Sequence, residues 1–373
     1  MKNNMMGKVI SLVLTVTLAA TVFVGCGSSG SSGGEAGSKD GLKKVNIVSP
    51  TSLASMDLCW IYAADGLGFF KDEGIEVNMI ESTDGSDPKI LGSGQADFGA
   101  FSPSVGLTAV QSGVDNVEGI CNVVAYNMFG IAVNKTGGIK DWSDLTGKQI
   151  GFVADTASSL YDPILKAAGV DPSSVSYVNY GTSEYEALNT DQVPAMGTWL
   201  SEYYMCEGMG YDWDYLSGND VLPQMANSLW VNTDYAKKNP EIVKKVVKAV
   251  TKAMYACYYN PEAVADITLV KYPSIEITWD GAVGAVKGNA AGMFGIEENE
   301  QQKNIDEKQI GVYDTDVVKQ TIENLKTGGA LTEDMDYASH YTNDYTQPDI
   351  DYSEVEKVCD SYEFQSKVYK EAN

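Results

Sequence analysis

The chain has 373 residues, enough for two domains of ordinary size, and a formal net charge of −25. This acidic surplus repels nucleic acid and excludes a basic binding patch, so we expect no nucleic-acid partner. All 26 basic residues are lysines, so the bidentate arginine fork that often binds carboxylate ligands cannot form. A neutral or weakly cationic ligand is therefore favoured.

The histidine and cysteine content argues against a metal or catalytic centre. The single histidine, His340, cannot build a metal site of several imidazoles, and a Ser-His-Asp triad could form only around it. The acidic runs match no calcium loop, and we expect neither metal nor cofactor. Export would permit disulfides, but there is no CxxC pair, and we expect most cysteines after Cys26 to be buried free thiols. These are Cys59, Cys121, Cys206, Cys257 and Cys359.

The first 42 residues are typical of a targeting segment followed by a tether. Lys2 and Lys8 precede an apolar run over residues 9–24, which is shorter than a membrane span and indicates a secretory signal. Residues 23–26, Phe-Val-Gly-Cys, resemble a bacterial lipobox, so we expect a signal peptide over residues 1–25 and lipidation of Cys26. The alternative is an uncleaved anchor helix. The Gly/Ser-rich stretch 26–42 predicts a flexible tether, with the protein anchored on the outer face of the cytoplasmic membrane.

The next stretch alternates between strand and helix patterns. Strands are expected at residues 45–48, 75–79 and 96–100. A helix that starts near Ser55 closes at Gly66–Gly68, and a short helix covers residues 88–91. This β-α-β-α-β order implies parallel strands with a ligand crevice at their carboxyl ends.

Two runs within this stretch resemble a known protein family. One is Gly-Phe-Phe at residues 68–70 followed by Glu-Gly-Ile-Glu-Val at 73–77, and the other is Leu-Gly-Ser-Gly-Gln-Ala-Asp-Phe-Gly at 91–99. Together they resemble the NitT/TauT and thiamine-pyrimidine solute-binding proteins of ABC importers, over about residues 43–295. The resemblance implies an α/β, two-lobed type II periplasmic-binding-protein fold, with mainly parallel sheets, flanking helices and a ligand cleft between the lobes.

Two short apolar strands that end in Val-Asn are interpreted as crossovers between the lobes. They cover residues 129–134 and 228–232. We therefore expect lobe I to comprise residues 43–134 plus 229–373, and lobe II to comprise residues 135–228. Strands of lobe II are expected at residues 147–153, 175–180 and 195–199. A helix that begins at Pro240 returns the chain to lobe I, and the polar region after Gly295 is expected to wrap lobe I as helices.

Strand ends of both lobes present aromatic and small polar side chains to the expected cleft. Such a set suits a flat, uncharged heterocycle, because rings stack on its faces while hydroxyls and carboxylates accept from its N–H groups. The candidates from lobe I are Asp57, Trp60, Phe101, Ser102 and Tyr126, and those from lobe II are Asp155, Thr156, Ser158, Tyr180, Trp199, Glu202 and Tyr203. Residues 199–202, Trp-Leu-Ser-Glu, are similar to a segment of thiamine-pyrimidine binders, which implies that Glu202 pairs with an aminopyrimidine.

Each candidate also has a purely structural interpretation. Trp60 fits a buried helix position, and Ser102 and Thr156 fit helix caps. Glu202 fits a solvated carboxylate, which is the ordinary state of that residue type. Trp199 and Glu202 together are the strongest pair, because clefts are commonly lined by aromatic rings with few placed polar groups.

These features predict a lipid-anchored solute-binding protein that is not an enzyme. It would capture an aromatic heterocycle, such as a thiamine-precursor pyrimidine, by lobe closure. The resemblance implies an ABC permease and ATPase as partners and a monomeric binding protein. One alternative is a sulfonate or nitrate-type anion held by helix N-termini and hydroxyls. A second is a pyrimidine-synthesis-like enzyme, although such enzymes use histidine and a cysteine cluster that this chain lacks, and a third is a surface sensor or adhesin.

Overall fold

A computed structural model describes residues 41–82, 84–153, 157–181, 184–296, 305–346 and 350–372. The expectations for the signal peptide, Cys26 and most of the tether lie outside these residues, as do those for Asp155 and Thr156. In the ranges described, every helix is too short or too polar to cross a membrane.

The first of two five-stranded sheets has the strand order β2-β1-β3-β10-β4. Its strands are β1 (Lys43–Ser49), β2 (Ile75–Glu81), β3 (Phe98–Phe101), β4 (Val117–Val124) and β10 (Asn227–Asn232). Strand β1 pairs in parallel with β2 and β3, whereas β10 runs antiparallel to β3 and β4. We call this sheet and the helices packed on it lobe I.

The second sheet, which with its helices we call lobe II, has the order β7-β6-β8-β5-β9. Its strands are β5 (Phe129–Asn134), β6 (Gln149–Phe152), β7 (Ser176–Asn179), β8 (Ala195–Trp199) and β9 (Trp213–Ser217). Strand β6 is parallel to β7 and β8, and β5 is antiparallel to β8 and β9. Its helices are α5 (Ala157–Ala167), α6 (Glu184–Asn189) and α7 (Leu200–Gly208).

The chain passes between the lobes twice, directly before β5 and directly before β10. Each strand enters the interior of the sheet it reaches and runs antiparallel to both of its neighbours. The sheets are therefore mixed and not mainly parallel. Because β5 pairs in lobe II, the change of lobe falls at residues 125–128 and not after Asn134.

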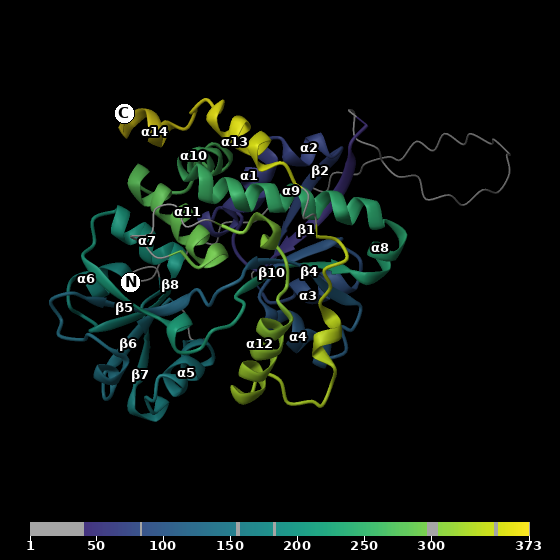
Figure 1. Ribbon diagram of the computed structural model, residues 1–373. Helices are drawn as coiled ribbons and strands as arrows, with labels where there is room; N and C mark the ends of the chain where they lie inside the picture. The colour runs from purple at the N-terminus through teal and green to yellow at the C-terminus, as the bar shows by residue number, and fades with distance from the viewer. Residues whose placement is uncertain are drawn as a thin grey trace, which may run out of the picture. The chain divides into compact units, whose positions relative to one another are not determined.

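One face of the lobe I sheet is covered by α1 (Cys59–Gly66), α2 (Phe69–Asp72), α9 (Pro240–Tyr259), α10 (Pro261–Lys271) and α11 (Trp279–Phe294). Figure 1 shows the long helix α9 beside α1 and α2. The helix expected from Pro240 is α9, and its Val243, Val247 and Val250 are buried in the core of this layer. The other face carries α3 (Asp87–Gly92), α4 (Pro103–Gln111) and α12 (Thr315–Thr327).

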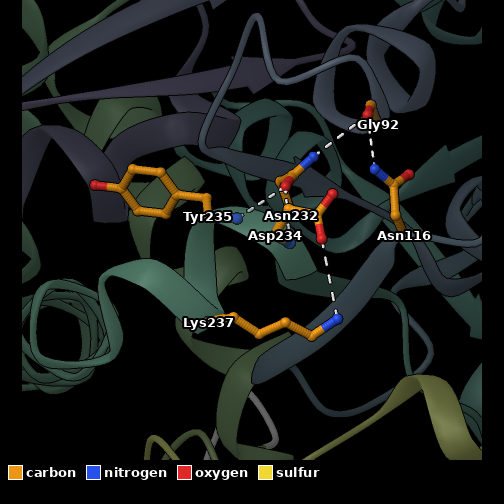
Figure 2. Close-up of polar contacts among 6 residues, drawn as sticks. All are labelled: Gly92, Asn116, Asn232, Asp234, Tyr235 and Lys237. Carbon is orange, nitrogen blue, oxygen red and sulfur yellow. Dashed lines mark hydrogen bonds and ion pairs between the residues drawn. The ribbon is translucent and has the colours of Figure 1, made fainter. Parts of the chain in front are cut away.

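Asn232 shows why a crossover strand ends in Val-Asn (Figure 2). Its amide oxygen accepts from the N–H groups of Asp234 and Tyr235, both at 3.0 Å, and so caps α8 (Thr233–Lys238). Its amide nitrogen donates to the carbonyl of Gly92 at 3.3 Å, which also accepts from Asn116 at 2.8 Å. One side chain thus starts a helix and fastens β10 to the end of α3.

The region after Gly295 packs mainly on lobe I, as expected, and also reaches the connections between the lobes. Gly311 and Tyr341 form bridges with β4 and so cover the edge of this sheet. In α12, the amide of Asn324 donates to the carbonyl of Pro223 at 3.1 Å, between β9 and β10. The chain ends with α13 (Tyr352–Asp360) and α14 (Lys367–Ala372).

The cysteine prediction is confirmed for the described part of the chain. Its five cysteines are all buried and free. All five have almost no exposed surface: four lie within the lobe I core, and Cys206 lies in a core of lobe II.

Candidate functional site

A cavity of about 100 Å³ lies between the two lobes. Lobe I contributes the turn from β3 into α4, lobe II contributes α5 and the start of β5, and the second connection and the region of α12 complete the walls. We call it the interlobe cavity; it is lined by Ser102, Pro103, Ser104, Phe129, Ser159, Leu160, Pro163, Leu222, Gln224, Met225, Ala226, Thr321, Asn324, Leu325, Gly328 and Ala330. None of these side chains is charged, so the cavity offers hydroxyls, amides and apolar surface.

The turn at Ser102 has a clear local cause. The hydroxyl of Ser102 accepts from the N–H of Val105 at 3.3 Å and Pro103 occupies the first helical position, so this turn starts α4. The helix therefore begins at the wall of the cavity; Pro103 has no N–H and those of Val105 and Gly106 donate to Ser102, so few donors of this turn remain for a ligand. Ser102 is the one described candidate that lines this cavity, and it acts as a helix cap as well.

Asp57 joins the two lobes directly. Its Oδ1 atom accepts from the indole Nε1 of Trp199 at 3.2 Å and from the hydroxyl of Ser201 at 2.6 Å. Its Oδ2 atom accepts from the hydroxyl of Ser55, which in turn caps the short 3₁₀ turn Met56–Leu58. Asp57 and Trp199, both candidates for ligand contact, thus bind each other in this conformation.

Glu202 belongs to a polar network inside lobe II. It accepts from the hydroxyl of Tyr185 at 2.7 Å and from that of Thr198 at 3.0 Å. Burial raises the pKa of the neighbouring phenols Tyr161 and Tyr215 well above the ordinary value, so both stay neutral donors. The carboxylate of Glu202 is therefore not simply solvated, because the hydroxyl groups of Tyr185 and Thr198 fix its position.

Two aromatic candidates, Trp60 and Phe101, are core residues, which was the structural alternative given for Trp60. Trp60 is fully buried in the lobe I core. Phe101 is also buried, and its ring stacks on Trp230 with 5.4 Å between the centroids. Both were placed near the cleft because they follow or begin elements at the strand ends, but their side chains turn into the lobe.

The remaining candidates are dispersed. Tyr203 is buried and donates to the carbonyl of Trp213 at 3.2 Å. Tyr180 donates to the carbonyl of Gln192 at 3.4 Å, and Ser158 is exposed on the first turn of α5. Tyr126 is 40% exposed and lies between β4 and β5, outside the lining of the interlobe cavity.

Several lining residues had no place among the candidates. Phe129 and Gln224 lie at the start of β5 and just before β10, so the crossover pattern itself could have pointed to them. Asn324 comes from α12, in the weakly patterned region. No local sequence signal places it beside Gln224, which is 100 residues earlier in the chain and also lines the cavity. Its amide donates to Gln224 Oε1 at 3.3 Å.

The single histidine lies away from the cavity. His340 Nδ1 is 3.0 Å from the carbonyl oxygen of Val117, at the start of β4, whereas the connection to lobe II follows the other end of that strand. Among the described residues, no cluster of three His, Cys, Asp or Glu side chains could hold a metal ion.

The sequence comparison with protein families is decisive for membership. Residues 55–264, more than half of the chain, match the model of the NMT1/THI5 like family. The chain belongs to this family. The matched span runs from the turn before α1 into α10, so it includes both connections between the lobes.

Individual relatives are distant. The 4-amino-5-hydroxymethyl-2-methylpyrimidine phosphate synthase THI11 of Saccharomyces cerevisiae is 27% identical over 208 residues, which is 52% of this chain and 61% of the yeast protein. The chain thus spans less than two thirds of that relative. The riboflavin-binding protein RibY of Chloroflexus aurantiacus is 23% identical over 289 residues, which is 76% of this chain and 81% of that protein.

Solved structures agree on the fold. The nitrate-binding protein NrtA of Synechocystis PCC 6803 superposes with a TM-score of 0.60 at 13% identity, covering 86% of this chain and 98% of that one. The alkanesulfonate-binding protein SsuA of Xanthomonas axonopodis pv. citri gives 0.57 at 14% identity, covering 80% and 98%. The predicted type II periplasmic-binding-protein fold is confirmed.

Proposed function

We propose that this protein is the extracytoplasmic solute-binding component of an ABC importer. The observation that carries the proposal is the interlobe cavity, which is walled by both lobes and by one of their two connections. A ligand that contacts both lobes stabilises the closed form over the open one, and the two connections act as the hinge. A permease and its ATPase subunits then receive the closed, monomeric protein, which Cys26 anchors to the outer face of the cytoplasmic membrane.

The preferred ligand is a small, uncharged aromatic heterocycle of the thiamine-pyrimidine kind. The described lining residues supply hydroxyls, two amides and the ring of Phe129 and include no charged side chain, which matches a planar molecule with several hydrogen-bonding groups. The names of the two relatives also concern heterocycles, a pyrimidine phosphate and riboflavin. The cavity is small, so the lobes have to separate further for such a ligand to enter.

An oxyanion is the second candidate ligand, and a specific feature favours it. The N-terminus of α4, with Ser102 and Ser104, faces the interlobe cavity and could bind a sulfonate or nitrate without arginine. The solved structures of similar fold include binding proteins for both kinds of anion.

Enzymatic activity is the less supported alternative. The family contains pyrimidine phosphate synthases, but the single imidazole of this chain lies at the far end of β4 from the connection to lobe II. Formation of a pyrimidine product by the purified protein, lost in His340→Ala, would revive the alternative.

We propose that the candidate residues contact the ligand in the bound form. Asp57 of lobe I bonds to Trp199 of lobe II, and Ser102 lines the interlobe cavity. We infer that an entering ligand takes over the hydrogen bonds that Asp57 and Trp199 make with each other. Glu202 then orients the ligand from lobe II.

Calorimetric titration tests this proposal. The probes are 4-amino-5-hydroxymethyl-2-methylpyrimidine, riboflavin, nitrate and ethanesulfonate. We expect one of the heterocycles to bind, and Gln224→Leu to weaken it about tenfold through the loss of a hydrogen bond. Gln95→Leu, at an exposed position, is the matched control. Binding of an anion but of neither heterocycle would favour the second ligand class. No heat of binding from any of the four probes would count against the solute-binding function.

A further inference from the structure

A second and larger cavity, of about 420 Å³, lies beside the first connection between the lobes. We call it the lateral cavity; it is lined by Asn122, Ala125, Tyr126, Met254, Met293, Phe294, Ile305, Asp306, Gln309, Ile310, Gly311, Val312, Asp314 and Val317. Among the described residues, the two linings have no member in common. Its walls come from β4, from α9 and α11, and from the segment that covers the edge of the lobe I sheet.

The wall of the lateral cavity is mainly apolar. Met254 and Met293 supply flexible thioether side chains, which adapt to irregular ligands, and Phe294 adds a ring. The ring of Tyr126 packs over Gly295, where a Cβ atom would lie 2.6 Å from its Cζ. This contact fixes Tyr126 at the rim although the side chain is 40% exposed.

One polar group in this wall lacks a partner. Asn122 is only 4% exposed, and its amide oxygen is buried without a hydrogen bond. An unpaired buried acceptor costs free energy, so a donor that reaches it is favoured. Rotation of the amide by a half turn exchanges its oxygen and nitrogen, so Asn122 can offer either an acceptor or a donor to a bound molecule.

The two charged side chains in the described part of the wall are both negative. Asp306 accepts from the N–H of Lys308, and Asp314 accepts from the N–H groups of Asp316 and Val317, so both carboxylates are held by their own turns. Among the lining residues that the structure describes, no lysine balances them. This described part of the wall repels an anionic ligand, whereas it does not repel a neutral or cationic one.

We propose that the lateral cavity is a second binding site, separate from the interlobe cavity, for a small organic molecule with an apolar body, a hydrogen-bonding group and no negative charge. The volume lies in the range of natural small-molecule pockets. Because Tyr126 belongs to the connection between β4 and β5, the occupant contacts the segment on which the lobes turn.

A pair of fluorescent probes tests the proposal on the full chain. N-phenyl-1-naphthylamine is neutral, and 8-anilino-1-naphthalenesulfonate has the same skeleton with one negative charge. We expect the neutral probe to bind at least ten times more tightly. Val312→Trp fills the cavity and should weaken binding of the neutral probe at least tenfold. The same change at Val270, which is 43% exposed on α10, should leave that binding unchanged. Equal binding by the two variants, or no binding at all, would overturn the proposal.

A second measurement does not depend on the folding of a variant. With ¹³C-methyl-methionine, the neutral probe should shift the methyl signals of Met254 and Met293 in the wild-type chain. Met225 lines the interlobe cavity, and its methyl signal should not shift. A shift of Met225 alone would put the probe in the interlobe cavity and refute a separate site, whatever the fate of the proposed transport function.

Discussion

The carboxylate of Asp57 accepts hydrogen bonds from Trp199 and Ser201, so one side chain of lobe I is joined to two side chains of lobe II. Asp87 has the opposite situation. It is 1% exposed at the start of α3, and neither of its oxygens has a hydrogen-bond partner. The same side-chain type therefore links the lobes at one position and remains unsatisfied at another.

The link through Asp57 can be tested by two substitutions. Asp57→Ala removes both hydrogen bonds of a charged acceptor, and we expect the free energy of unfolding to fall by about 2 kcal/mol. Asp57→Asn keeps an acceptor oxygen and should lose less than half as much. Urea denaturation measures both, and the emission of Trp199 should move to longer wavelength in the alanine variant as its indole is hydrated. Equal losses in the two variants would show that the charge matters and the hydrogen bonds do not.

Asp87 predicts a pH dependence of stability. Burial raises its pKa to about 6, and the negative charge of Asp84 acts in the same direction. The folded chain therefore binds a proton that the unfolded chain releases between about pH 4 and pH 6. The contribution of Asp87 to stability is full below about pH 4, falls as the pH rises to about 6, and stays low above that.

Asp87→Asn should remove this loss. At pH 7 we expect the variant to be more stable than the wild type by about 1 kcal/mol, allowing for solvent screening, and equal to it near pH 4. Urea denaturation at intervals between pH 4 and 8 gives the comparison. Asp334→Asn, at an exposed position, serves as the control and should show no such crossing. A constant difference at every pH would contradict an ionisation effect.

At the scale of elements, the contact between α7 and α11 decides how closely the lobes approach. A Cβ atom added at Gly284 would collide with the carbonyl of Tyr204, and one at Gly288 would collide with that of Leu200. The two backbones therefore touch, with α7 in lobe II and α11 packed on α9 and α10. Separating the lobes at this point would have to break a backbone-to-backbone contact.

Gly288→Ala should damage this contact. The added methyl meets main chain, which cannot move aside as a side chain does, so we expect a loss of about 3 kcal/mol despite the better helix propensity of alanine. Gly292→Ala is the matched control in the same helix, because its nearest neighbour is a side-chain methyl of Val124 at 3.0 Å. Thermal unfolding of both variants tests the difference. A Gly288 variant as stable as the wild type would mean that the helices separate easily.

The same elements show what the sequence could predict. Period-two runs located β1, β2 and β3, and the two runs that end in Val-Asn located the strands β5 and β10, because these are local patterns. The pairing of β5 in lobe II depends on partners more than 60 residues away, so its lobe was misassigned. For the site, a strand end shows where a turn lies but not which way a side chain points, so Trp60 and Phe101 were placed in the cleft although both are core residues.

At the scale of the whole molecule, charge is the dominant feature. The chain carries 51 acidic residues against 26 lysines. The ion pairs found in the described residues lie mostly between exposed side chains, as for Lys135 and Asp212 at 2.8 Å. Such pairs contribute little to stability, so they offset little of the repulsion among the carboxylates.

Salt should therefore stabilise this protein at neutral pH. Raising the ionic strength from 0.01 to 0.15 M shortens the screening length from about 30 Å to about 8 Å, which weakens repulsion between distant surface charges. We expect the Tm at pH 7 to rise by about 3–6 °C over this range, since self-repulsion acts chiefly on the compact state. Differential scanning calorimetry in sodium chloride measures the change. Near pH 4 about half of the carboxylates are protonated, so the same salt series should have little effect there. A falling Tm at pH 7 would mean that attractive pairs outweigh the net charge, and a rise of equal size at pH 4 would point to salt acting on apolar hydration and not on charge.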